Sequence, residues 1–125
     1  MKKIINTDLA PAPIGPYNQA VLVDNTLYIS GQIAMDPKTG QLHIEDVKEE
    51  THRVMKHLGS ILNEAGMDYS NIVKCSIFIS DMGQFSNINE VYGSYFKSDP
   101  PARETVQVSC LPKNVNVEIS AIAVA

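Results

Sequence analysis

Cysteine is scarce, tryptophan is absent and basic residues are in the minority in this chain of 125 residues. Cys75 and Cys110 are too few for a disulfide framework and form no Cys-x-x-Cys pair, so we expect a reducing compartment. Ten basic against fourteen acidic side chains give a net charge of −4. This balance argues against a nucleic-acid partner, because binding to phosphates requires clustered Lys and Arg.

Long apolar runs and the motifs of common enzyme classes are also missing. No segment approaches the roughly 20 apolar residues of a membrane-spanning helix, and none has the pattern of a signal peptide. The motif Ile-Ser-Gly-Gln at 29–32 is not the Gly-x-Ser-x-Gly elbow of serine hydrolases, and no Gly-rich phosphate loop occurs. The histidines His43, His52 and His57 lack metal-ligand spacing. We therefore expect a cytoplasmic protein with no membrane partner and no metal site.

Apolar material is sufficient for one folded domain over residues 1–125, since hydrophobic residues make up 44% of the chain and charged residues 19%. Residues 2–6 predict a short edge strand. Three prolines make residues 8–17 a stiff, extended loop. The apolar runs 20–23 and 27–29 flank an Asp-Asn-Thr turn and predict a hairpin.

The rest of the chain alternates between helix and strand patterns. Apolar side chains at helical spacing predict a long helix over 47–65. A strand is predicted over 73–79, a shorter helix over 87–96, and two final strands over 103–108 and 115–124. The simplest packing of this order is an α+β fold, in which a single antiparallel or mixed β-sheet is backed by both α-helices on one face.

The two final strands carry the pair of residues with the clearest chemical potential. If the loop around Pro112 closes an antiparallel hairpin, the register that pairs apolar with apolar side chains puts Arg103 and Glu118 on the same polar face. Spacing alone favours a surface salt bridge, worth roughly 0–1 kcal/mol. The alternative is a carboxylate-binding arginine beside a glutamate that orients or deprotonates water. The rigid Pro-Pro-Ala lead-in at 100–102 adds weight to this alternative.

Several segments together resemble the Rid family, also called the YjgF/YER057c/UK114 family, and within it the archetypal imine deaminases. The resemblance spans essentially the whole chain, with the segments in the family's order. They are TDLAPAPIGPYNQA at 7–20, ISGQ at 29–32, DPKTG at 36–40, Phe85 with NEVY at 89–92, PPARETV at 100–106 and VEI at 117–119.

The resemblance implies a fold of the chorismate-mutase-like kind and a homotrimer with ligand clefts between its subunits. It also implies hydrolysis of 2-aminoacrylate and of 2-imino acids, such as 2-iminopropanoate and 2-iminobutanoate, to 2-keto acids and ammonia. These small molecules would be the protein's ligands. Because imines hydrolyse readily in water, positioning can suffice for catalysis, and neither a metal nor an organic cofactor is required.

The resemblance also assigns roles to individual positions. Arg103 matches the arginine that binds the substrate carboxylate, and Glu118 matches the glutamate that places the attacking water. Beside the charge of Arg103, Glu118 is expected to stay ionised in the free enzyme. The positions that match further pocket residues are Tyr17, Ser30, Gly31 and Asn89.

This chain departs from the family at two positions. Thr105 stands two residues after the arginine, where family members commonly have cysteine. If this substrate-binding position acts through its backbone, Thr is tolerated, and if the thiol matters, substrate preference differs. Asn18 stands where serine is frequent, a small polar change that we expect to be tolerated.

A second hypothesis is a trimeric binding protein that does not catalyse a reaction. In it, the protein senses 2-keto acids or other small carboxylates, and Arg103 binds them equally well. Replacing Glu118 with Gln separates the two hypotheses, because an enzyme would lose rate more than affinity. Ribonuclease and chaperone activities are also attributed to this family, but the acidic balance and the lack of a basic aromatic stripe count against RNA cleavage.

Overall fold

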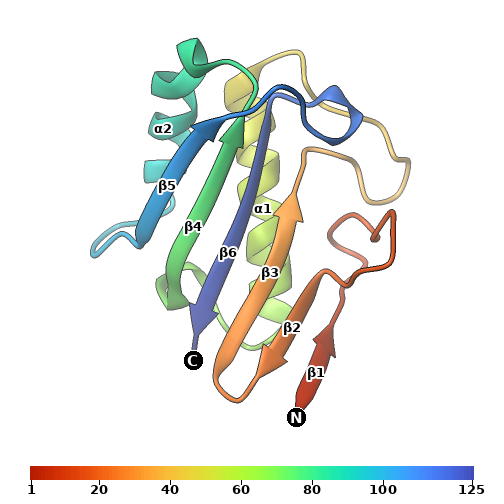
Figure 1. Cartoon of the computed structure of the whole chain (residues 1–125). Coiled ribbons are helices and arrows are strands. Elements are labelled where there is room, and N and C mark those ends of the chain that lie inside the picture. The colour runs from red at the N-terminus through yellow and green to blue at the C-terminus, as the bar shows by residue number, and fades with distance from the viewer.

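Figure 1 shows the computed structural model, which describes all residues 1–125. One six-stranded sheet has the order β1-β2-β3-β6-β4-β5. Its strands are β1 (Lys2–Ile5), β2 (Ala20–Val23), β3 (Thr26–Gln32), β4 (Ile72–Ile79), β5 (Ala102–Gln107) and β6 (Val117–Val124). The helices are α1 (Val47–Glu64) and α2 (Phe85–Gly93), with short 3₁₀ turns η1 (Tyr69–Asn71), η2 (Met82–Gln84) and η3 (Pro112–Asn114).

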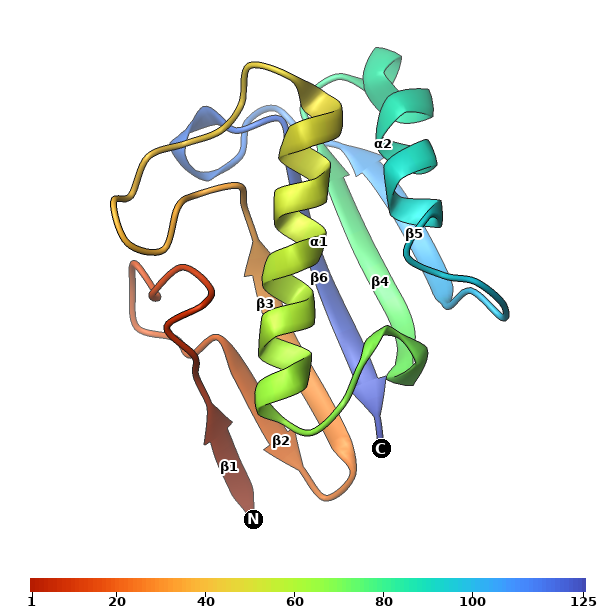
Figure 2. The same ribbon diagram turned by 180° about the vertical axis from the view of Figure 1, so that it is seen from behind.

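Both helices cover the same face of the sheet, as Figure 2 shows, and the predicted α+β architecture is confirmed. Helix α1 begins after Asp46, whose side chain accepts a hydrogen bond from the backbone of Lys48 at 3.0 Å. Leu58 and Leu62, in the middle of its apolar stripe, are completely buried against the sheet. Neither helix has the length and apolar character needed to cross a membrane.

The predicted hairpin between the last two strands is wrong. Strand β5 pairs in parallel with β4, and β6 lies between β3 and β4, antiparallel to both. The burial pattern gives the reason. Every second residue of β6 from Val117 to Ala123 is buried, whereas no residue of β5 is. A strand with a fully apolar face gains most in the centre of the sheet, and the polar strand delivered by the β4–α2–β5 crossover takes the edge.

The order β6-β4-β5 has a direct consequence for the predicted site. In the parallel pair, Arg103 lies opposite Cys75, a buried residue on the helix-covered face. In the antiparallel pair, Glu118 lies opposite Phe78, on the other face of β4. Arg103 and Glu118 therefore lie on opposite faces of the sheet, with β4 between their strands. The expectation that they share one face within a single chain is wrong.

Candidate active site

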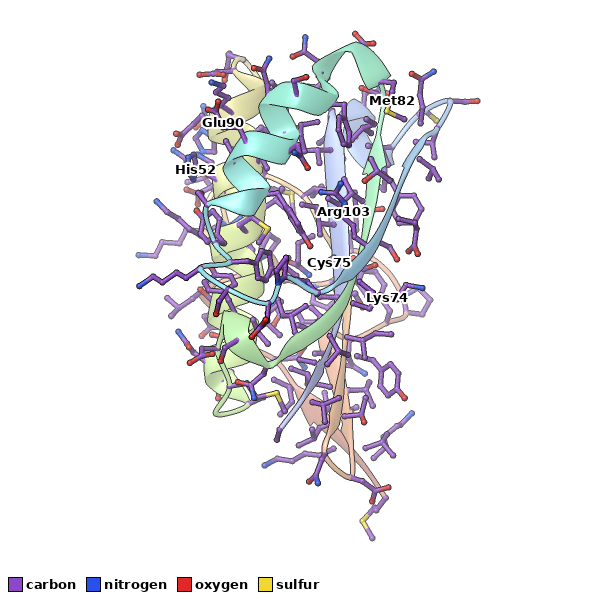
Figure 3. All side chains as sticks on the ribbon, turned by 90° about the vertical axis from the view of Figure 1, so that its left-hand side faces the viewer. His52, Lys74, Cys75, Met82, Glu90 and Arg103 are labelled. Atoms are coloured by element: carbon purple, nitrogen blue, oxygen red, sulfur yellow. The ribbon has the colours of Figure 1, made fainter.

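Arg103 is held by three side chains of α2. Its guanidinium carbon lies 5.5 Å from the ring centre of Phe85 and 5.2 Å from that of Tyr92. Its Nη1 donates a hydrogen bond to Oδ1 of Asn89 at 2.7 Å. Figure 3 shows Arg103 extending from β5 toward α2. Because Asn89 occupies only one nitrogen and the residue is exposed, the guanidinium keeps donors free for a carboxylate.

Thr105 follows Arg103 on the same face of β5, opposite the buried Ile77. Its hydroxyl oxygen is shielded from solvent and has no hydrogen-bond partner in the chain. A buried hydroxyl without a partner is costly, so Thr105 keeps an unmet hydrogen bond on the face that carries Arg103. We call Arg103, Asn89 and Thr105 the arginine half of the site.

Glu118 lies on the face of the sheet that carries no helix, which we call the open face. Its side chain is directly over Gly31. A Cβ atom built on Gly31 would lie 2.7 Å from Cδ and 2.9 Å from Oε2 of Glu118. The pairing of β3 with β6 is irregular between Ile29 and Gln32, and this irregularity contains Gly31. Glycine at position 31 is therefore what allows the Glu118 side chain to pass close to the backbone of β3.

Burial raises the pKa of the Glu118 carboxyl above its ordinary value of 4.5. The expectation that Arg103 keeps this carboxyl ionised from within the same chain is wrong, because the two side chains are separated by the sheet. A half-buried carboxylate with a raised pKa is a better proton acceptor than an exposed one, which suits a general base.

Tyr17 and Ser30 line a hollow of about 520 Å³ on the same open face as Glu118. The Ser30 hydroxyl donates to the carbonyl of Asn18 at 2.7 Å, and the Tyr17 hydroxyl accepts from the backbone of Ile14 at 3.3 Å. The first bond ties the end of the Pro-rich segment to β3, and the second closes a turn within that segment. We call Tyr17, Ser30, Gly31 and Glu118 the glutamate half of the site.

Three residues that support the two halves lie in segments quoted in the sequence analysis but received no individual role there. Phe85 and Tyr92 stack on Arg103, and their spacing of four and three residues around Asn89 is the available signal, because it puts all three on one helical face. Gln19 is buried, and its amide nitrogen donates to the carbonyls of Thr7 and Pro11 at 3.0 and 2.9 Å. No local pattern marks Gln19 as the anchor of the Pro-rich loop.

The contact between Gly31 and Glu118 gives a first prediction. Replacing Gly31 with Ala is expected to turn the Glu118 side chain away. This should lower kcat for the imine hydrolysis that the sequence resemblance implies roughly 10-fold to 100-fold, the cost of misplacing a reacting group by about 1 Å. The flexible carboxylate can swing out, so the chain should remain folded. Gly93→Ala is the matched control, because a Cβ there meets no atom within 4 Å. Equal kcat values for the two variants would contradict the prediction.

Two helices behind one mixed sheet, with an exposed arginine at its edge that keeps hydrogen-bond donors free and a half-buried glutamate on its open face, define a class of small α+β proteins. The chain belongs to the Rid (YjgF/UK114) family, since the family model described as Endoribonuclease L-PSP matches residues 7–125.

Individual relatives support this membership over the whole chain. A human protein named 2-iminobutanoate/2-iminopropanoate deaminase is 49% identical over 99% of this chain and 90% of its own length. The Rid-family protein YyfA of Yersinia pestis is 44% identical, with a TM-score of 0.97 and full coverage of both chains. The structure of E. coli TdcF with bound serine is 40% identical, with a TM-score of 0.94 and 98% coverage of each chain.

Proposed function

We propose that this protein hydrolyses reactive 2-imino acids, such as 2-iminopropanoate and 2-iminobutanoate, to 2-keto acids and ammonia. The observation that carries the proposal is the Arg103 guanidinium, oriented by Asn89 and two aromatic rings with donors left free. The name of the human relative supports the same substrates. The serine bound to TdcF is itself a small amino acid with a carboxylate.

The proposed reaction consumes one water and needs no cofactor. Arg103 binds the substrate carboxylate through two parallel hydrogen bonds and thereby fixes the imine carbon. Glu118 accepts a proton from water as its oxygen attacks that carbon, and the imine nitrogen takes up this proton from Glu118, giving a carbinolamine. The amino group then takes up a proton and leaves as ammonia, while the hydroxyl loses its proton and becomes the keto oxygen.

The opposite placement of the two halves supports a site shared by two copies of the chain. A single substrate cannot touch both Arg103 and Glu118 of one chain, because the sheet separates them. We propose a homotrimer in which each cleft takes its arginine half from one subunit and its glutamate half from a neighbour. Strand β5 suits this arrangement, because it lies at the sheet edge and carries Arg103 and Thr105 there.

The raised pKa of Glu118 predicts a pH dependence. The carboxyl must be ionised to accept a proton, so kcat/KM should fall as the pH decreases through a pKa above 4.5. The pH profile of enzymatic imine loss, corrected for the reaction in buffer, measures this acid limb. A limb at or below 4.5 would show that the positive charge of the neighbouring subunit's Arg103 outweighs the effect of burial on Glu118.

The same raised pKa has a consequence for stability. The unfolded chain ionises Glu118 more readily than the folded one, so the carboxylate weakens the fold at neutral pH, and this penalty disappears as the pH falls below the unfolded value. Glu118→Gln should therefore be at least as stable as the wild type at pH 7 in a urea titration. Any loss of turnover in this variant is then a loss of chemistry and not of folding.

The direct test of the proposal uses imines generated in situ by an amino-acid oxidase, with a trapping amine that competes for them. Wild-type protein should accelerate imine loss over buffer and reduce the trapped product. Analytical ultracentrifugation of the same sample should give the mass of three chains. A folded trimer that gave no acceleration would overturn the enzyme and favour a sensor of small carboxylates.

A further inference from the structure

Glu50 is a completely buried carboxylate that belongs to neither half of the site. It lies in the first turn of α1, on the helix-covered side of the sheet. Burial raises its pKa, whereas hydrogen bonds from Asn116 and Val117 act in the opposite direction. Acidic side chains are rarely buried so completely unless their oxygens receive hydrogen bonds.

All the hydrogen bonds of the Glu50 carboxylate go to Asn116 and Val117, at the beginning of β6. Its Oε2 accepts from the backbone nitrogens of Asn116 and Val117 at 2.8 and 3.2 Å. Its Oε1 accepts from Nδ2 of Asn116 at 2.7 Å. One side chain therefore ties two consecutive backbone N–H groups of the sheet to the helix.

The segment that Glu50 holds has a strand on only one side, because β3 ends before reaching it. The last residue of β3 that pairs with β6 is Gln32, opposite Ile119, so residues 116–118 have no β3 partner. On the other side, β4 still holds the segment, with the backbone of Ser80 donating to the carbonyl of Asn116 at 3.1 Å. Glu50 supplies the acceptors for the two backbone N–H groups at the point where the β3–β6 pairing has ended.

Glu118 is the next residue after this anchored pair. The backbone position of Glu118 decides whether its carboxylate lies over Gly31. The space between this carboxylate and the backbone of Gly31 is too small even for a Cβ atom. A shift of the β6 start would lift the carboxylate from this contact. We infer that Glu50 is a positioning residue, which fixes the water-activating Glu118 by anchoring Asn116 and Val117. The inference deepens the proposed function and rests on it for its kinetic consequence.

Three variants separate positioning from simple loss of stability. Glu50→Ala leaves the two backbone N–H groups without their acceptor. Glu50→Gln keeps one oxygen for them, while the Asn116 amide can turn to face the new NH2 group at the cost of its 3.3 Å hydrogen bond to the carbonyl of Ile44. Thr51→Ala is the matched control, because Thr51 is equally buried in the same turn but its hydroxyl bonds only to the carbonyl of Val47 in its own helix.

The first measurement is the pKa of Glu118 by carbon NMR titration of its carboxyl group, which requires no turnover. Glu50→Ala should move this pKa down toward the ordinary value, because the carboxylate leaves its half-buried place over Gly31. Glu50→Gln and Thr51→Ala should leave it within error of the wild type. The second measurement is imine hydrolysis, in which Glu50→Ala should lower kcat about tenfold with KM little changed.

The outcomes are distinct for the positioning role and for the proposed function. An unchanged Glu118 pKa in folded Glu50→Ala, or an equal shift in Thr51→Ala, would overturn the positioning role. A loss in Glu50→Gln as large as in Glu50→Ala would also overturn it, because the shared acceptor oxygen would then not matter. If the wild type does not hydrolyse imines but the pKa pattern holds, the proposed function fails while the anchoring of Glu118 stands.

Discussion

Replacing Arg103 with Ala is expected to lower kcat/KM for 2-iminopropanoate by about 100-fold or more while the chain stays folded. Two charge-assisted hydrogen bonds to the substrate carboxylate are lost, at roughly 1.5–3 kcal/mol each. The effect on stability should be small, since the residue is exposed at the sheet edge and its aromatic contacts contribute about 0.5–1 kcal/mol. Imine loss in competition with a trapping amine measures the rate, and thermal unfolding checks the fold.

Two further variants sharpen this result. Arg103→Lys keeps the positive charge but loses the planar fork, so it should recover only part of the activity. Lys97→Ala removes an exposed positive charge that follows the C-terminal end of α2, and this variant should behave as wild type. Wild-type turnover in Arg103→Ala would remove this residue from the mechanism and leave the carboxylate without a binding group.

The parts of the fold that sequence predicts well are those with a local cause. The long helix expected over 47–65 is observed as Val47–Glu64, and the strand expected over 73–79 as Ile72–Ile79. Helical and alternating periodicities arise within one segment, so they can be read without knowledge of its neighbours. The shorter helix, expected over 87–96, is observed as Phe85–Gly93 after a 3₁₀ turn, which shows how weakly sequence marks helix ends.

Strand pairing has no such local cause, and the pairing predicted from the sequence for the last two strands is wrong. Residues 103–108 and 115–124 follow each other closely, which suggests a hairpin, yet they are separated in the sheet by β4. The difference in their burial patterns is visible in the sequence as a polar and an apolar strand. It could have indicated an edge strand and a central strand, but the neighbours of each depend on the packing of the whole sheet.

The candidate site likewise combines features that the sequence reveals locally with features that only the whole fold determines. Arg103 and Glu118 stand out by residue type, but their opposite faces follow only from the sheet order. Glycine is needed at position 31 because a Cβ atom there would lie only 2.7 Å from Cδ of Glu118, and no sequence pattern predicts this contact. Glu50 looks like one more acid on a solvated helix face, and only the structure shows it buried against the start of β6.

Mixing two inactive variants should restore activity if each cleft combines halves from two subunits. Arg103→Ala chains keep an intact glutamate half, and Glu118→Gln chains keep an intact arginine half. After unfolding and refolding together in equal amounts, about a quarter of the clefts in random trimers should contain both wild-type groups. The mixture should therefore reach about a quarter of wild-type activity, although each variant refolded alone is strongly impaired.

The control mixture distinguishes shared clefts from clefts built within one chain. Wild-type protein refolded with an equal amount of the Arg103→Ala, Glu118→Gln double variant should fall from about half to about a quarter of full activity, because mixed trimers divide the intact groups between clefts. If each cleft came from one chain, this mixture would stay at about half and the two single variants would not rescue each other. Since β4 separates Arg103 from Glu118 in every chain, we expect rescue in the first mixture and loss in the second.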